Sequence, residues 1–414
     1  MLKKVLFLSV LSLSVIISDC DARRPKGKSA KVTQQLPAKE KKNPQRVARA
    51  NITRDNIQEI GAAQMILVDF DGERLFEKNA DERCVPSSMT KLMTAYLLFE
   101  AIENGSLKLE DELPVSELAQ GKEGSRSFFK AGTLAKVEDL VRSIVVHSGN
   151  DACTIVAEKI SGSDDAFAEL MNQKAETFGL QNTHFMNSTG LPDENHYSCA
   201  SDLTTIAKRL ISDFPQYYHY FSEKTFTVND ITQHNRNTLL GNSMNVDGLK
   251  TGKTDAGGFG IVVSAKKDGK RLICVVNGCK SMKERAFEAN KILSIGFAEF
   301  MPVTIAASYK AVGSAKVSIG KSDTVGVCTH EDIVVSILKK YKGNIVVELS
   351  LDEPVEAPIV AGNKLGTMVF KYGTFVSKPY DVFAIEGVEK LTFWERVKAF
   401  MFKRDAEPTN APKS

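Results

Sequence analysis

Two Asp-Gly pairs, at 71–72 and 268–269, constrain the fold of this 414-residue chain more than any other feature. Asp-Gly supplies the positive φ values that a two-residue hairpin needs, and β-type residues flank both pairs. Between the pairs lie helical patterns, one after Pro86 and one near Asp164, each repeating apolar residues on one face. This order predicts one α+β domain over 55–300, with helices on an antiparallel sheet whose terminal strands pair.

A second domain of different character is expected over 301–386. Its β-rich runs are separated by Gly, Pro, Asp and Asn, as in small all-β domains. The runs are Val303–Ala307, Ala315–Ile319, Ile333–Leu338, Ile345–Leu349, Leu365–Phe370 and Val382–Ile385.

The C-terminal segment is predicted to form an amphipathic helix over 387–404, followed by a polar tail over 405–414. Its apolar face contains Trp394, the only tryptophan in the chain, and basic residues lie beside that face. A basic amphipathic helix with aromatic residues is typical of an anchor to an anionic membrane surface. The alternative is a helix that packs on its own β domain.

The N-terminal segment is predicted to be an export signal over 1–22. Lys3 and Lys4 precede an apolar stretch that ends in a polar break at Asp19. A core strand or an N-terminal membrane anchor is the alternative. Lipid attachment at Cys20 is disfavoured because Asp19 stands where a small residue is needed.

A basic disordered tether is expected over 23–54. Residues 21–50 contain ten Lys/Arg against two Asp/Glu and few large apolar residues, so burial cannot offset the entropy of ordering. No aromatic side chains are interleaved to stack on bases, so nucleic-acid binding is not expected. Residues 51–386 contain 36 basic and 44 acidic residues. The net charge of +3 therefore combines an acidic body with basic ends suited to an anionic membrane.

The seven cysteines include no CxxC pair. Export permits disulfides, but the low density favours buried small apolar thiols. None of the six histidines has the HExxH spacing of a zinc peptidase, and the GxSxG motif of α/β-hydrolases is absent. We expect no metal and no cofactor.

Three short motifs point to serine chemistry. Ser88 and Lys91 are three residues apart, on one face of a helical turn, where a desolvated lysine can act as base for the serine. The helix N-terminus there offers N–H groups to an oxyanion. Ser148-Gly-Asn150 and Lys250-Thr251-Gly252 follow along the chain, the last on a predicted edge of the sheet. Each motif is common alone, but their order is that of penicillin-recognising serine enzymes.

The chain resembles low-molecular-mass penicillin-binding proteins, specifically the serine-type D-alanyl-D-alanine carboxypeptidases of peptidase family S11. The resemblance covers about 55–386 and extends to residues 146–153, 180–185, 235–237 and 245–252. It implies a transpeptidase domain of the penicillin-binding and β-lactamase type, followed by the all-β domain and the terminal helix.

The resemblance implies a role for each motif residue. Ser88 attacks the carbonyl between two terminal D-alanines of a peptidoglycan stem peptide, Lys91 takes its proton, and Ser148 relays a proton to the leaving amine. The implied substrate-binding residues are Asn150, Lys250, Thr251, Gly252, Arg236 and Arg285. Backbone N–H groups of Ser88 and Lys253 form the oxyanion hole, although better-known relatives carry His at the position of Lys253.

The implied partners are stem peptides that end in D-Ala-D-Ala, β-lactams that acylate the same serine, and an anionic membrane surface. The implied location is the periplasmic face of the cytoplasmic membrane, with peripheral attachment through the C-terminal helix. Trimming of this kind limits cross-linking and so influences cell shape.

Four alternative functions fit parts of the sequence. A β-lactamase is disfavoured because Glu169–Asn172 is one residue short of the deacylating motif. A nucleotide-binding P-loop is disfavoured because Asp247 stands where its first glycine belongs. The intact Ser88, Lys91 and Lys250 argue against a non-catalytic wall-binding protein. Endopeptidase activity on D-Ala cross-links remains open, since it uses the same acylation.

Overall fold

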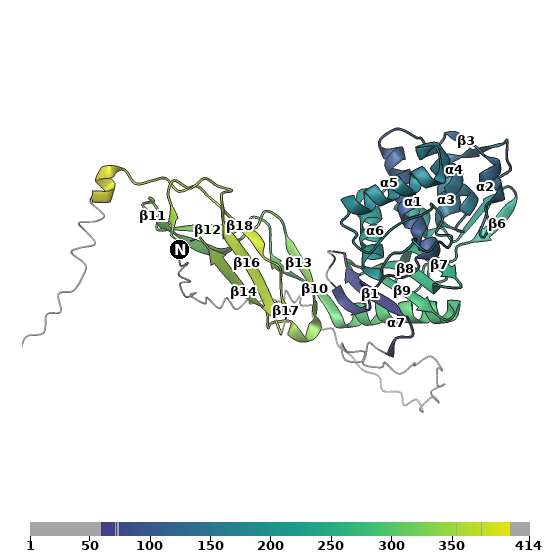
Figure 1. The fold of residues 1–414 in the computed structure, drawn as a ribbon. Coiled ribbons are helices and arrows are strands. Elements are labelled where there is room, and N and C mark those ends of the chain that lie inside the picture. The colour runs from purple at the N-terminus through teal and green to yellow at the C-terminus, as the bar shows by residue number, and fades with distance from the viewer. Residues whose placement is uncertain (1–58, 71, 73, 353, 374, 398–414) are drawn as a thin grey trace, which may run out of the picture. The chain divides into compact units, whose positions relative to one another are not determined.

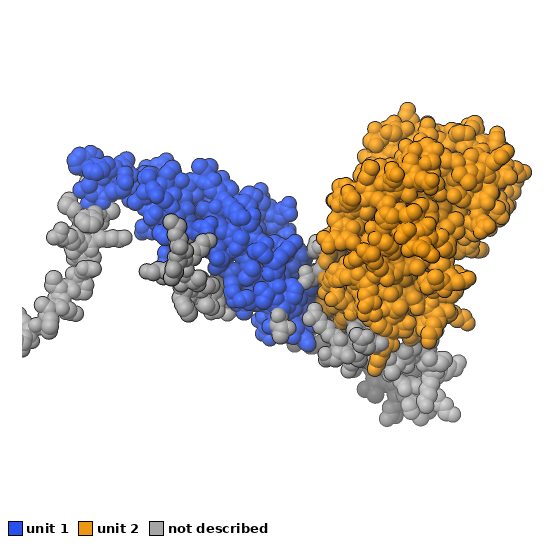
Figure 2. Space-filling model, viewed as in Figure 1, with its two compact units in different colours: residues 1–49, 302–414 blue, residues 50–301 orange. Residues whose placement is uncertain are grey.

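The computed structural model describes residues 59–70, 72, 74–352, 354–373 and 375–397 (Figure 1). The chain divides into two compact units, one over 50–301 and one that includes 302–414 (Figure 2). The predicted signal over 1–22, the predicted tether over 23–54 and the predicted tail over 405–414 all lie outside the described residues.

A five-stranded antiparallel sheet is the base of the first unit, in the order β2-β1-β9-β8-β7. The strands are β1 (Gln64–Asp69), β2 (Arg74–Lys78), β7 (Val246–Thr254), β8 (Gly258–Lys267) and β9 (Lys270–Cys279). Both predicted hairpins are present, as β1–β2 and β8–β9. β1 also pairs with β9, with Met65 opposite Val276, which confirms that strands from the two ends of the domain meet.

Helices cover both faces of this sheet (Figure 1). The longer helices are α1 (Lys91–Glu103), α3 (Val137–Val145), α4 (Asn150–Ser161), α5 (Asp164–Thr177), α6 (Ala200–Asp213) and α7 (Met282–Glu299). The shorter elements are α2 (Glu117–Gly121), 3-10 turns η2 (Ser87–Thr90) and η3 (Tyr218–Ser222), and the strand pairs β3 (Glu112–Pro114) with β4 (Leu134–Lys136) and β5 (Thr225–Val228) with β6 (Ile231–His234).

The alternation of β1 side chains decides which helices pack on which face. Ile66 and Val68 belong to the core formed with α1 and α6. Leu67 points to α7, where a Cβ on Gly296 would lie 2.6 Å from the Leu67 Cδ2 atom. Glycine at this position therefore lets α7 approach the sheet closely.

Helix α1 is the central helix of the first unit. Most of its residues are buried, and it packs against α3, α4, α5 and α6. The predicted helix after Pro86 is present, but it starts with η2 as a 3-10 turn before α1 begins at Lys91. The predicted helix near Asp164 is α5, and its N-cap Ser163 accepts a hydrogen bond from the Ala166 N–H (3.1 Å).

Up to Leu391, the described part of the second unit is all-β, as predicted, apart from the 3-10 turn η4 (Lys339–Tyr341). Its sheets have the orders β10-β13 and β14-β16-β18-β12-β11-β15, with β17 paired to β16. The strands are β10 (Phe300–Ala306), β11 (Ala311–Ser318), β12 (Thr324–Cys328), β13 (Ile333–Leu338), β14 (Val346–Leu351), β15 (Val355–Glu356), β16 (Lys364–Tyr372), β17 (Phe375–Val376) and β18 (Tyr380–Ala384). The sequence did not indicate β12, β15 or β17. All three strands are short, and Gly326 interrupts the β-type residues of β12.

The C-terminal helix begins later than predicted. Val388 pairs with Ile359 in a β-bridge, so the segment after Gly387 starts extended instead of helical. Helical residues begin at 393, after Thr392 and Glu395 exchange hydrogen bonds between their side chains and backbone N–H groups, as in a capping box. Residues 398–404 of the predicted helix lie outside the described residues.

Two exposed aromatic side chains follow this cap: Phe393 is 66% exposed and Trp394 is 73% exposed. None of the helices in the described part of the chain is both long and apolar enough to cross a membrane.

All six cysteines in the described residues are free thiols, and five of them are buried, as expected for small apolar packing residues. Only Cys84 is partly exposed, and burial raises the pKa of its thiol to about 12.

Replacement of Phe99 by alanine is predicted to destabilise the first unit strongly. Phe99 is 1% exposed and its ring lies 5.2 Å from the Tyr217 ring and 5.8 Å from the Phe214 ring. The resulting cavity should lower the free energy of unfolding by about 3–5 kcal/mol, measured by denaturant titration. Phe287→Ala is the control, because Phe287 is 51% exposed, and a loss of similar size there would contradict the packing argument.

Candidate active site

The predicted nucleophile and base meet where η2 joins α1. Lys91 Nζ donates a hydrogen bond to Ser88 Oγ (3.1 Å) and another to the Thr189 carbonyl oxygen (2.5 Å). Ser88 is partly exposed, whereas Lys91 is only 1% exposed. The turn therefore presents a reachable hydroxyl with a buried amine behind it.

Burial changes the acid–base behaviour of Lys91. Loss of hydration disfavours its ammonium form and lowers its pKa from the ordinary lysine value, although nearby Asp151 and Asp164 oppose the shift. Lys91 therefore loses its proton and becomes a neutral amine at a lower pH than a surface lysine does. An amine in that state can accept the hydroxyl proton of Ser88.

The second motif lies between α3 and α4. Ser148 has a left-handed backbone (φ 71°), is 4% exposed, and its Oγ has no hydrogen-bond partner within the described residues. Both a positive φ and an unsatisfied buried hydroxyl are costly, and such features concentrate at functional sites. Asn150 begins α4, and its side-chain Nδ2 donates to the Glu123 carbonyl oxygen (2.5 Å).

The third motif lies on β7, the edge strand of the sheet, as the sequence predicts. Lys250 is 2% exposed and its Nζ donates to the Thr251 carbonyl oxygen (3.2 Å). Burial, reinforced by the charge of Lys91, lowers the pKa of Lys250 well below its ordinary value. The two lysines, far apart in sequence, therefore interact electrostatically within one site.

Gly252 allows β7 to lie directly against the nucleophile turn. A Cβ at this position would be 2.9 Å from the Pro86 carbonyl oxygen and 3.1 Å from Ser87 Cβ. The hydrogen bond between the Ser87 and Thr254 hydroxyls (2.9 Å) also joins the turn to the strand.

The two predicted arginines differ in exposure. Arg285 is 4% exposed, and its guanidinium donates to the Arg236 carbonyl oxygen (3.2 Å). Burial lowers its pKa to about 10. The side chain of Arg236 is exposed. Because Arg285 donates to the Arg236 carbonyl oxygen, it supports the main chain that presents this exposed side chain. The charges of Arg236 and Lys250 also help burial to lower the pKa of His147 to about 4.

Lys253 carries an exposed side chain that pairs with the exposed carboxylate of Asp255 (2.6 Å). Its main chain continues β7 opposite Phe259. The side chain therefore points away from the buried lysines, and only the backbone of Lys253 belongs to the strand beside the nucleophile turn.

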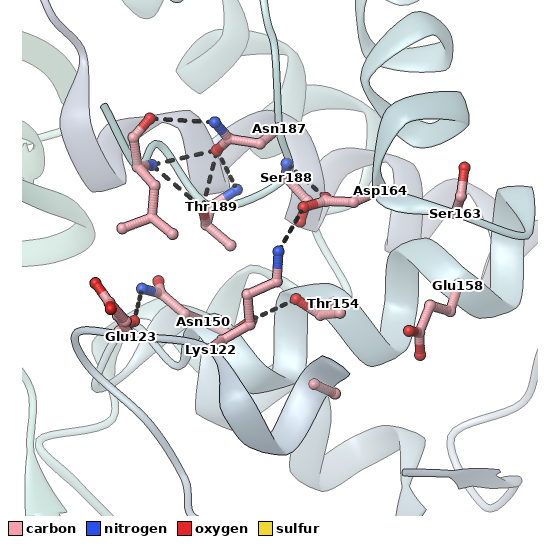
Figure 3. A network of polar contacts seen from close by, with 12 residues as sticks. Lys122, Glu123, Asn150, Thr154, Glu158, Ser163, Asp164, Asn187, Ser188 and Thr189 are labelled. Atoms are coloured by element: carbon pink, nitrogen blue, oxygen red, sulfur yellow. Dashed lines mark hydrogen bonds and ion pairs between the residues drawn. The ribbon is translucent and has the colours of Figure 1, made fainter. Parts of the chain in front are cut away.

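A loop over 187–191 completes the site and belongs to none of the three predicted motifs. Its Thr189 carbonyl accepts from Lys91, and its Ser188 carbonyl accepts from Thr94 Oγ1 (2.6 Å). The Asn187 carboxamide oxygen accepts from the N–H groups of Thr189, Gly190 and Leu191 (Figure 3). Gly190 has φ 79°, and a Cβ there would collide with the Ser87 carbonyl, so this loop packs on the nucleophile turn.

These parts fit acyl transfer through a serine. The hydroxyl and the amine base come from the nucleophile turn, a second buried hydroxyl comes from the segment between α3 and α4, and the β7 edge lies beside the turn. Within the described part of the chain, no three His, Cys, Asp or Glu side chains gather to hold a metal ion.

The comparisons with known proteins agree with this chemistry. A family model for D-alanyl-D-alanine carboxypeptidase (peptidase S11) matches residues 50–281, and one for the C-terminal domain of penicillin-binding protein 5 matches residues 300–390. D-alanyl-D-alanine carboxypeptidase DacA of Escherichia coli is 38% identical over 327 residues, which are 76% of this chain and 80% of DacA.

Two solved structures are also similar. Penicillin-binding protein 5 from Haemophilus influenzae has a TM-score of 0.75 and 35% identity, covering 80% of this chain and 98% of that one. Penicillin-binding protein D2 from Listeria monocytogenes, in a cefotaxime-bound form, has a TM-score of 0.53 and 30% identity, covering 57% of this chain and 98% of that one. The chain therefore belongs to the S11 family of serine D-alanyl-D-alanine carboxypeptidases, with the penicillin-binding protein 5 type of C-terminal domain.

Proposed function

We propose that Ser88 is the nucleophile with which this enzyme removes the terminal D-alanine from peptidoglycan stem peptides. The observation that carries the assignment is the hydrogen bond from the buried Lys91 amine to Ser88 Oγ (3.1 Å). Lys91 takes the hydroxyl proton as Ser88 Oγ bonds to the penultimate carbonyl carbon. The bond to the D-alanine nitrogen then breaks, and water later hydrolyses the ester.

The leaving amine needs a proton, and Ser148 is proposed to relay it, because its buried Oγ has no other partner within the described residues. The backbone N–H groups of Ser88 and Lys253 are proposed to bind the oxyanion. Asn150 and Thr251 are proposed to bind the substrate amide and the terminal carboxylate.

Positive potential around the carboxylate is assigned to Lys250 and Arg236. Lys250 is also proposed to orient Ser148 during the reaction. Gly252 keeps β7 close to the nucleophile turn, and Arg285 supports the Arg236 backbone. These roles favour an anionic C-terminus over an internal peptide bond. Endopeptidase action on D-Ala cross-links would use the same acylation and is the second activity to assay.

β-Lactams are proposed to acylate Ser88, since the relative from Listeria monocytogenes has a cefotaxime-bound structure. The protein is proposed to be exported and attached peripherally to the periplasmic face of the cytoplasmic membrane. The N-terminal apolar stretch and the exposed Phe393 and Trp394 after the β domain support this location. Activity there would limit cross-linking and influence cell shape.

Ser88→Ala is expected to abolish release of D-alanine from a peptide that ends in D-Ala-D-Ala. Loss of the nucleophile should reduce kcat/KM by more than about 10⁴-fold, measured by chromatography of free D-alanine. Ser212→Ala, at an exposed position of α6, is the control and should keep wild-type activity. Equal release by the Ser88 variant and the wild type would refute the assignment.

The acylation rate is expected to rise with pH through the pKa of Lys91. Since burial lowers this pKa in the folded protein, the neutral base appears below the ordinary lysine range and is lost as pH falls through the folded pKa. The measurement is the rate of covalent labelling by a β-lactam across pH. Lys91→Arg should label slowly at every pH, because a guanidinium stays protonated. Rapid labelling of this variant would exclude Lys91 as the base.

Truncation after Leu391 is expected to move the protein from the membrane fraction to the soluble fraction. This end point keeps Val388 and Lys390, which pair with the β domain. The double variant Phe393→Ala/Trp394→Ala should weaken sedimentation with anionic vesicles, because it removes apolar area from the interface. Unchanged membrane attachment of the truncated protein would show that another segment is the main anchor.

A further inference from the structure

A partly buried ion pair near the active site links the end of α2 to the start of α5. Lys122 Nζ lies 3.0 Å from Asp164 Oδ2, and the side chains are 18% and 12% exposed (Figure 3). Lys122 follows the end of α2, whereas Asp164 is the first residue of α5. None of the three catalytic motifs includes either residue.

On one side, the ion pair leads to the base. The second carboxylate oxygen of Asp164 accepts a hydrogen bond from the Ser188 N–H (3.0 Å). The next residue, Thr189, provides the carbonyl that accepts from Lys91 Nζ. Burial alone would raise the pKa of Asp164, but hydrogen bonds from Ser188 and Lys122 hold it below the ordinary value, so it stays ionised.

On the other side, the ion pair leads to the second motif. The residue after Lys122 is Glu123, whose carbonyl oxygen accepts from Asn150 Nδ2, and the Ser125 carbonyl accepts from the Asn150 backbone N–H (2.7 Å). Asn150 is two residues from Ser148. In Figure 3, Lys122 reaches from the loop beside Asn150 towards Asp164 and the loop that contains Ser188 and Thr189.

We propose that Lys122 and Asp164 are positioning residues, which tie the loop behind Lys91 to the loop behind Asn150 and so fix the distance across the active site. Neither side chain touches the reacting atoms. The inference rests on the proposed roles of Lys91 and Asn150. A pair at low exposure loses little to solvent screening, and removal of one partner leaves the charge of the other uncompensated.

The proposal predicts that Lys122→Met and Asp164→Asn each lower kcat/KM for a D-Ala-D-Ala peptide by about 10- to 100-fold, the effect of a small misplacement of catalytic groups. Lys122→Arg preserves the cation and should restore activity to within about threefold of the wild type. Lys174→Met is the matched control. Lys174 is also on α5 and pairs with Glu100 (2.6 Å), but this pair joins α5 to α1 away from the two loops.

The pH profile separates positioning from general loss of stability. Asp164 is one of the charges that favour protonated Lys91, so Asp164→Asn should move the acid limb of β-lactam acylation to lower pH. Lys122→Met leaves the Asp164 carboxylate uncompensated, so it should move the limb to higher pH. The control variant should leave the limb in place.

Other groups around Lys91 do not reverse these signs. Asp151 on α4 and Lys250 on β7 remain in all variants. Burial raises the pKa of the Cys153 thiol to about 12 and lowers that of the His196 imidazole to about 4, so both stay neutral between these values.

Thermal unfolding of each variant should accompany the kinetics. If Lys122→Met yields too little folded protein, Lys122→Gln removes the charge while keeping a donor near Asp164. The proposal would be overturned if folded Lys122→Met and Asp164→Asn kept the wild-type kcat/KM. It would also be overturned if the acid limbs of their acylation profiles did not move in opposite directions. A failure of the proposed function would be seen separately, because a β-lactam would then label the Lys91→Arg variant rapidly.

Discussion

Burial of two lysines in one site is the constraint on which the catalytic domain depends. Lys91 and Lys250 are 1% and 2% exposed, and removing an ammonium from water costs several kcal/mol unless the protein replaces its hydration. Carbonyl oxygens of Thr189 and Thr251 provide part of that replacement. Such dipoles help only when they are already in place. The surrounding loops must therefore be held before substrate arrives, which is the preorganisation that serine acylation requires.

The fold meets this requirement by fixing each wall of the site to a different rigid element. The nucleophile turn continues into the buried helix α1, and the β7 wall is the edge of an antiparallel sheet. Close contacts at Gly252 and Gly190 press these walls against the turn. Because neither position has room for a side chain, the spacing between the walls is set by backbone contact, which varies less than contact between flexible side chains.

Much of this architecture could be predicted from sequence because its signals are local. The two Asp-Gly pairs predicted both hairpins, and the order of the motifs predicted that Ser88, Lys91 and Lys250 share one site. The loop over 187–191 could not be found in this way, since it acts through main-chain carbonyls that any residue carries. The predicted start of the last helix was wrong for another reason. Val388 and Leu391 suit the apolar face of a helix, but main-chain hydrogen bonds to Ile359 and Ile319 keep this segment extended.

That extended segment has a mechanical consequence. Main-chain hydrogen bonds join Val388 to Ile359, Glu389 to Lys321 and Leu391 to Ile319. A pull applied at the C-terminal end would therefore be carried by these bonds before it reached the rest of the β domain. The short helical segment after Thr392 is thus tethered to the β domain through main-chain hydrogen bonds, which do not depend on the identity of its side chains.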